Sequence, residues 1–223
     1  MVLTVTLLGG ESTGKTTLAQ SLHHQLTDQG IATTLVPEHL RDWCAAHGRA
    51  PRSHEQSELA REQARRIDNA AAQPGARVVI ADTAPLVIAA YSELYFNDLS
   101  LHAGAIAWQR HVGLTLLMGL DLPWVPDGLF RESPAVREAT DAAIRHQLQV
   151  ASLPYQTVYG QGEARSRQAL RAIGAALGQA LTPSDPVWPQ GRRPWNCDTC
   201  SDPDCEHRLF TQLLSQRPTD TAP

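Results

Sequence analysis

A glycine-rich motif that can bind phosphate stands close to the N-terminus. Residues 9–16, Gly-Gly-Glu-Ser-Thr-Gly-Lys-Thr, match the Walker A pattern Gly-x-x-x-x-Gly-Lys-[Ser/Thr] in full. The glycines let the backbone wrap closely around phosphates, which amide N–H groups and a helix N-terminus then bind. The lysine of such a loop contacts the outer phosphates, and the threonine hydroxyl binds Mg²⁺. ATP and Mg²⁺ are therefore the expected cofactors, bound by Gly9, Gly10, Glu11, Ser12, Thr13, Gly14, Lys15, Thr16 and Thr17.

Lys15 is the only lysine among the 19 Lys and Arg residues. A compact ammonium on a flexible stem suits the space between phosphates better than a planar guanidinium does. The alternative is a coding bias toward arginine that leaves one lysine by chance. A standard GTPase is not expected, because its Asn/Thr-Lys-x-Asp guanine motif needs a second lysine.

An acidic residue ends an apolar run further along the chain. Asp82 follows residues 78–81, Val-Val-Ile-Ala, where P-loop proteins place a carboxylate that binds Mg²⁺ directly or through water. We expect Thr16 and Asp82 to share the Mg²⁺ ion. The alternative role for Asp82 is an N-cap of the helix that follows.

A second carboxylate follows the predicted strand at residues 31–36. Glu38 stands just beyond it, and the carboxyl ends of parallel strands form the ligand crevice of such folds. Glu38 is therefore the candidate general base, which accepts the proton of a substrate hydroxyl during attack on the γ-phosphate. Arg41 lies one helical turn on and is a candidate contact for phosphate or ribose. The alternative is a surface helix start.

A third segment has the composition of a mobile lid. Residues 121–131 read Asp-Leu-Pro-Trp-Val-Pro-Asp-Gly-Leu-Phe-Arg and lie between a predicted strand and a predicted helix. Arg131, with Arg137 as a second candidate, is expected to stabilise charge on the transferring phosphoryl group. Trp124 is expected to stack on an aromatic base, with packing on the core as the alternative.

The order of elements predicts an α/β fold of the P-loop NTPase type, with a doubly wound, mostly parallel sheet flanked by helices. Strands are expected at residues 2–8, 31–36, 78–82, 112–120 and 155–159. Helices are expected at 15–28, 53–72, 85–95, 101–110, 134–152 and 163–181. Ser53-x-x-Gln56 is interpreted as a capping box, and Ser133-Pro134 as an N-cap followed by proline at the first helical position.

Taken together and in this order, four segments resemble the ribosylnicotinamide kinase domain of the NadR family. They are the Walker A motif, Pro-Glu-x-x-Arg at 37–41, Ile-Ala-Asp-Thr at 80–83 and Trp-Val-x-Asp-Gly at 124–128. The resemblance covers about residues 1–180 and implies ATP-dependent phosphorylation of nicotinamide riboside. It implies site roles for Glu38, Asp82, Trp124 and Asp127. No adenylyltransferase or DNA-binding segment accompanies these motifs, so it implies the kinase step alone.

Composition changes after the predicted kinase domain, residues 1–181. Residues 182–196 are rich in proline and tryptophan and are interpreted as a linker, and residues 197–223 as a short Cys-rich appendage. Within the appendage, Cys197, Cys200, Cys205 and His207 are expected to bind a structural Zn²⁺ ion, since Cys₃His is a common tetrahedral zinc set. A redox Cys-x-x-Cys pair and inert thiols are the alternatives.

Bulk properties limit the classes of partner. The chain of 223 residues has a net charge of −4 and a pI near 6.1, which argues against a general nucleic-acid binder. No apolar run is long enough to span a bilayer, and the N-terminus lacks the basic start of a signal peptide, so a cytoplasmic location is expected.

The predicted function is a small-molecule kinase for nicotinamide riboside or a similar nucleoside. A kinase for another small alcohol, or a regulatory ATPase with a partner-docking zinc tail, is the alternative, and the oligomeric state stays open.

Overall fold

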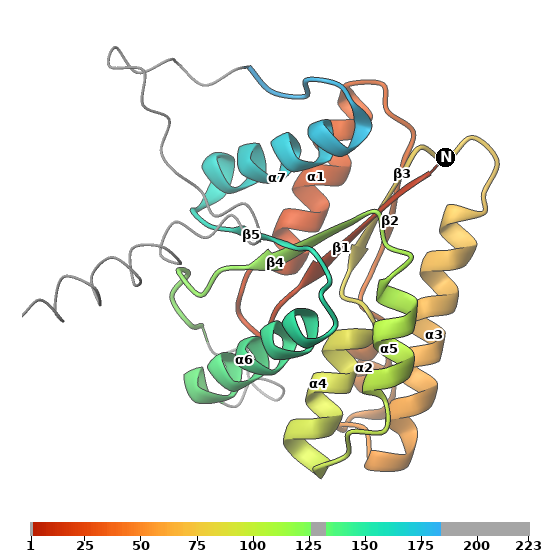
Figure 1. Cartoon of the computed structure of the whole chain (residues 1–223), viewed down its shortest axis with the longest axis vertical. Coiled ribbons are helices and arrows are strands. Elements are labelled where there is room, and N and C mark those ends of the chain that lie inside the picture. Colours follow the sequence, from red (N-terminus) through yellow and green to blue (C-terminus); the bar gives the residue numbers. More distant parts are fainter. Residues whose placement is uncertain (1, 126–132, 184–223) are drawn as a thin grey trace, which may run out of the picture.

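A five-stranded parallel sheet forms the centre of the molecule. A computed structural model of the chain describes residues 2–125 and 133–183. The strand order is β2-β3-β1-β4-β5, and each strand pairs in parallel with its neighbour (Figure 1). The chain leaves β1 to form β2 at one edge and later crosses over β1 to form β4. The loops after β1 and β3 therefore lie side by side at the carboxyl edge, which is where ligands bind in such sheets.

The elements alternate as the sequence predicts. The strands are β1 (Leu3–Leu8), β2 (Thr33–Val36), β3 (Val78–Asp82), β4 (Leu114–Met118) and β5 (Gln156–Val158). The helices are α1 (Lys15–Asp28), α2 (His39–His47), α3 (Ser53–Ala71), α4 (Pro85–Phe96), α5 (His102–Gln109), α6 (Pro134–Val150) and α7 (Gly162–Leu177). The predicted α/β P-loop fold is confirmed.

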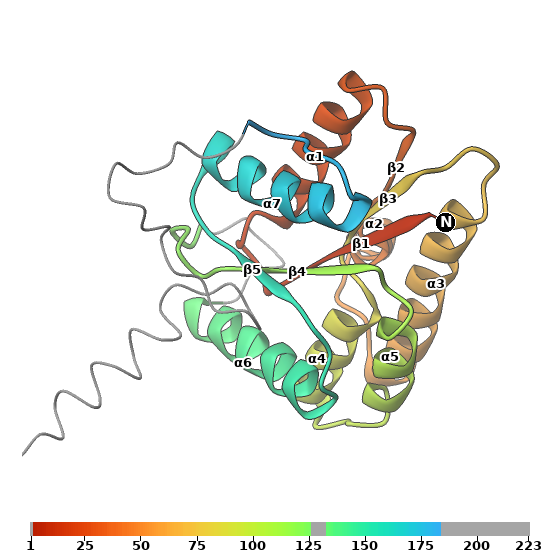
Figure 2. The same ribbon diagram turned by 45° about the horizontal axis from the view of Figure 1, so that its top comes forward.

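Helices cover both faces of the sheet, as Figure 2 shows. Leu18, Leu22 and Leu26 of α1 pack with Leu170 and Ile173 of α7 against one face. Helices α3 to α6 cover the opposite face. All five residues of β3 are buried, which explains why its first four residues are all apolar instead of alternating with polar ones. The two-sided core holds the strand ends in fixed positions.

Two predictions of helix starts had different outcomes. Ser133 is the N-cap of α6, and its side chain accepts a hydrogen bond from Val136 N, as predicted. The predicted Ser53–Gln56 capping box is wrong, because the N-cap of α3 lies one residue before Ser53. Arg52 is the N-cap, and Glu55 Oε2 accepts a hydrogen bond from Arg52 N at 2.7 Å. A bidentate contact from Arg49 holds Glu55 in this position.

The predicted tail lies beyond the part of the chain that the structure describes. Nearly all of the expected linker at 182–196, and all of the appendage at 197–223, fall outside it. Among the described residues, no helix is both long and apolar enough to cross a membrane.

Leu7→Ala should destabilise the protein by about 2–5 kcal/mol, because it leaves a cavity beneath the loop that follows β1. Leu7 is fully buried, whereas Leu99 is 58% exposed. Leu99→Ala should change the free energy of unfolding by no more than about 0.5 kcal/mol. Urea denaturation of both variants checks this, and equal losses in the two would contradict the core described above.

Candidate active site

The Walker A segment forms a tight loop between β1 and α1. Gly9 and Gly14 have positive φ angles of 149° and 77°. The left-handed φ of Gly14 is a conformation that L side chains rarely adopt, so glycine is needed there. Lys15 is buried, and its Nζ donates hydrogen bonds of 2.8 Å to Gly9 O and Gly10 O. The only lysine of the chain is thus folded back over the loop that is expected to hold phosphate.

Thr16 and Asp82 meet across the junction of β1 and β3, as a shared Mg²⁺ site requires. Thr16 Oγ1 donates a hydrogen bond of 2.6 Å to Asp82 Oδ2. Asp82 Oδ1 is buried and has no hydrogen-bond partner among the described residues. The N-cap of α4 is Ala84, so the structure does not give Asp82 the alternative capping role. A hydroxyl and a carboxylate with a free oxygen fit a hard cation that prefers oxygen ligands.

Glu38 stands at the end of β2 and faces the same crevice. Its side chain is only 11% exposed, and Arg41 Nη2 lies 3.2 Å from Glu38 Oε2. Burial raises the pKa of Glu38, and the charge of Asp82 raises it further, while Lys15 and Arg41 oppose the shift. Arg41 Nη1 also donates to Thr16 Oγ1 at 3.3 Å. Arg41 therefore connects the candidate base to the candidate metal site.

Tyr91 lies within reach of the charges of Glu38 and Arg41, and no sequence pattern predicted a role for it. It lies on α4, is 7% exposed and pairs with Tyr95 at a ring-centroid distance of 6.1 Å. Burial raises the pKa of Tyr91, and the charges of Glu38 and Glu11 raise it further. No spacing motif marks this position, since α4 is apolar nearly throughout.

The segment after β4 folds over the phosphate loop. Val125 N donates a hydrogen bond of 2.8 Å to Ser12 Oγ. Trp124 is half-buried, and its Nε1 is buried without a hydrogen-bond partner among the described residues. Arg137 on α6 is buried and donates from Nη1 to Leu122 O at 2.8 Å.

Several predicted site residues cannot be placed. Asp127 and Arg131 of the expected lid lie outside the described residues, and so do Cys197, Cys200, Cys205 and His207 of the expected zinc site. Within residues 2–125 and 133–183, no group of three or more His, Cys, Asp or Glu side chains is arranged to hold a metal ion.

Arg165 braces the phosphate loop from behind and was also missed. It lies on α7 and is 4% exposed. Its Nη2 donates to Thr13 O at 2.9 Å and its Nη1 to Gly160 O at 3.0 Å, while Asp121 Oδ1 lies 3.4 Å from Nη1. One guanidinium thus joins the phosphate loop to the segments after β4 and β5. Thr13 lies 152 positions from Arg165 in the sequence, so no local pattern predicts this contact.

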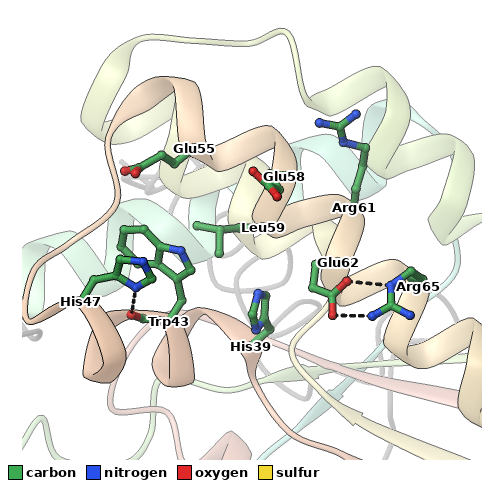
Figure 3. Close-up of a pocket in the computed structure, with 9 residues that line it drawn as sticks. All are labelled: His39, Trp43, His47, Glu55, Glu58, Leu59, Arg61, Glu62 and Arg65. Atoms are coloured by element: carbon green, nitrogen blue, oxygen red, sulfur yellow. Dashed lines mark hydrogen bonds and ion pairs between the residues drawn. The ribbon is translucent and has the colours of Figure 1, made fainter.

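A surface hollow of about 590 Å³ lies between α2 and α3, outside this crevice (Figure 3). His39, Trp43 and His47 line it from one face of α2, whereas Glu38 and Arg41 occupy another face. Trp43 stacks on His47 at 3.9 Å, and Arg49 covers the indole at 4.8 Å from its centroid. The Trp43 indole thus already packs against His47 and Arg49, and we assign no ligand to this hollow.

Comparison with known proteins shows the family of the chain. A family model described as "AAA domain" matches residues 4–165, which include the phosphate loop, Glu38 and Asp82. No curated protein matches the chain.

Two solved structures share the fold. One is a crystal structure of NadR protein in complex with NAD and AMP-PNP, with a TM-score of 0.66 and 18% identity over 82% of this chain and 52% of that chain. Another is NadR protein in complex with NR, with a TM-score of 0.68 and 19% identity over 82% of this chain and 53% of that chain. The chain thus spans about half the length of those proteins. The resemblance to NadR inferred from the motifs is confirmed at the level of the fold.

Arg165→Met should raise the dissociation constant for Mg·ATP by about tenfold, because it removes charge-assisted hydrogen bonds that hold the phosphate loop. Arg167→Met is the matched control: Arg167 lies two residues on in α7, is 46% exposed and pairs with Glu163. It should leave the dissociation constant unchanged. Calorimetric titration checks both, and equal affinities for the two variants would contradict the bracing role of Arg165.

Proposed function

The chain belongs to the AAA domain family, and we propose that it is an ATP-dependent small-molecule kinase. Its favoured acceptor is nicotinamide riboside or a similar nucleoside. The observation that carries the proposal is the place of Glu38. A buried carboxylate with a raised pKa faces the same crevice as Lys15, Thr16 and Asp82. A carboxylate in this position can accept the proton of an acceptor hydroxyl as that hydroxyl attacks the γ-phosphate.

Each side chain then has a distinct role. Lys15 and the loop amides bind the outer phosphates of ATP. Thr16 and Asp82 would hold Mg²⁺, which when bound neutralises charge on these phosphates. The acceptor hydroxyl oxygen forms a bond to the γ-phosphorus as the bond to the ADP oxygen breaks, and Glu38 takes the hydroxyl proton. Arg41 holds the Glu38 carboxylate in place.

The raised pKa of Glu38 suits this role. A carboxylate that binds a proton more readily is a stronger base, provided that it is ionised at the working pH. Burial thus raises the pKa of Glu38, while the charges of Lys15 and Arg41 oppose the shift.

The acceptor is proposed on two grounds. The fold neighbours include NadR protein in complex with NR, a nucleoside. In this chain Trp124 precedes Val125, which donates to Ser12 of the phosphate loop, and an indole ring there suits a ligand that carries a planar ring. We propose Asp127 as a further substrate contact and Arg131, with Arg137, as the lid cation. The remaining candidate acceptors are other nucleosides and small alcohols.

ADP release measured with Mg·ATP and a panel of nucleosides should depend on nicotinamide riboside. Lys15→Ala is the blank, and its turnover should fall by at least about a hundredfold, because it removes a cation that stabilises the transferring phosphoryl group. If only another acceptor supports turnover, that acceptor is the substrate and nicotinamide riboside is not. Slow ATP hydrolysis that no acceptor accelerates would contradict the kinase assignment.

Glu38→Gln should slow turnover strongly while making the protein more stable at neutral pH. The folded-state pKa of Glu38 lies above its ordinary value of 4.5, so the ionised form is disfavoured by folding. The associated loss of stability is absent below pH 4 and grows as the pH rises through the raised pKa. Thermal melts at pH 4 and pH 7.5 check this. A variant that is less stable than the wild type at pH 7.5 would contradict the raised pKa.

A further inference from the structure

A completely buried glutamine holds the backbone on both sides of Glu38. Gln63 lies on α3 with 0% exposure. Its Oε1 accepts a hydrogen bond of 2.8 Å from His39 N, and its Nε2 lies 3.4 Å from Pro37 O. Pro37 and His39 are the neighbours of Glu38 in the chain. One side-chain amide thus fixes the peptide groups before and after the candidate base.

The same amide reaches the end of the neighbouring strand. Gln63 Nε2 also lies 3.4 Å from Thr83 O, and Thr83 follows the candidate metal ligand Asp82. Thr83 has a φ angle of +86°, an uncommon conformation for a β-branched residue that surrounding contacts must maintain. Thr83 N donates to Leu7 O at 3.2 Å, and Gln63 holds its carbonyl. Gln63 therefore joins the ends of β2 and β3.

We infer that Gln63 is a positioning residue that sets Glu38 against Asp82 for phosphoryl transfer. The expected effect of Gln63 on the rate of phosphoryl transfer rests on the proposed function. Its hold on the backbone around Glu38 rests on geometry alone. Only a side chain with both an acceptor and a donor can bind His39 N and the two carbonyls at once. A misplacement of about 1 Å in such a site is enough to lower a rate by about a hundredfold.

Gln56 provides a matched control on the same helix. It lies two helical turns before Gln63 and is 3% exposed, so both are buried glutamines of α3. Gln56 Oε1 has no hydrogen-bond partner among the described residues. Gln56→Met and Gln63→Met thus make the same change of side chain at similar depth. Only Gln63→Met removes contacts to the strand ends.

The test combines amide hydrogen exchange with steady-state kinetics on the full chain. In Gln63→Met, the amide of His39 should exchange about tenfold faster or more, because its acceptor is lost. The kcat of phosphoryl transfer should fall about tenfold to a hundredfold, with the KM for Mg·ATP unchanged, since the phosphate loop is intact. Gln56→Met should leave both unchanged at temperatures well below melting.

A second variant guards against a failure of Gln63→Met to fold. Gln63→Glu keeps the length of the side chain and an acceptor for His39 N, so it should retain most of the protection of that amide. Exchange at His39 that is equally fast in the wild type and in Gln63→Met would overturn the inference, as would an equal fall of kcat in Gln56→Met. If the wild type transfers phosphate to no acceptor, the proposed function fails, while the exchange result still decides whether Gln63 holds Glu38.

Discussion

The register of β1 against β3 is the constraint on which the site depends. The two strands pair in parallel with Leu7 opposite Asp82, and Thr83 N donates to Leu7 O just beyond. This register brings Asp82 level with the start of the phosphate loop, so that Thr16 Oγ1 reaches Asp82 Oδ2 at 2.6 Å. A slip by one residue would turn the carboxylate to the other face of the sheet. The apolar core on both faces of the sheet is what fixes the register.

Buried polar groups around the crevice are supported by few but specific contacts. Arg165 holds the phosphate loop through Thr13 O, and Gln63 holds the ends of β2 and β3. Both side chains donate to backbone carbonyls in the interior, where an unpaired polar group costs free energy. Burial raises the pKa of Glu38, and the like charge of Asp82 raises it further. The fold thus accepts a less stable carboxylate where proton transfer is proposed.

Much of this arrangement could be predicted from the sequence, because local patterns carry it. The Walker A motif predicts the phosphate loop, and Asp82 and Glu38 each stand at the carboxyl end of a predicted strand. The contacts of Gln63, Tyr91 and Arg165 could not be predicted in this way. Gln63 reaches Thr83 O, and Arg165 reaches Thr13 O, both of which lie twenty or more positions away. The charge that acts on Tyr91 belongs to Glu38, which is also remote in the sequence. The predicted capping box failed because Glu55, held by Arg49, accepts the hydrogen bond from Arg52 N and so places the box one residue earlier.

We propose that the crevice transfers phosphate to a hydroxyl of a small acceptor and not to water. Following ATP by ³¹P NMR in the presence of nicotinamide riboside tests this proposal most directly. The γ-phosphate signal should be replaced, mole for mole, by a phosphomonoester signal while ADP accumulates. Inorganic phosphate as the sole new phosphorus product beside ADP would contradict it and would identify the chain as an ATPase.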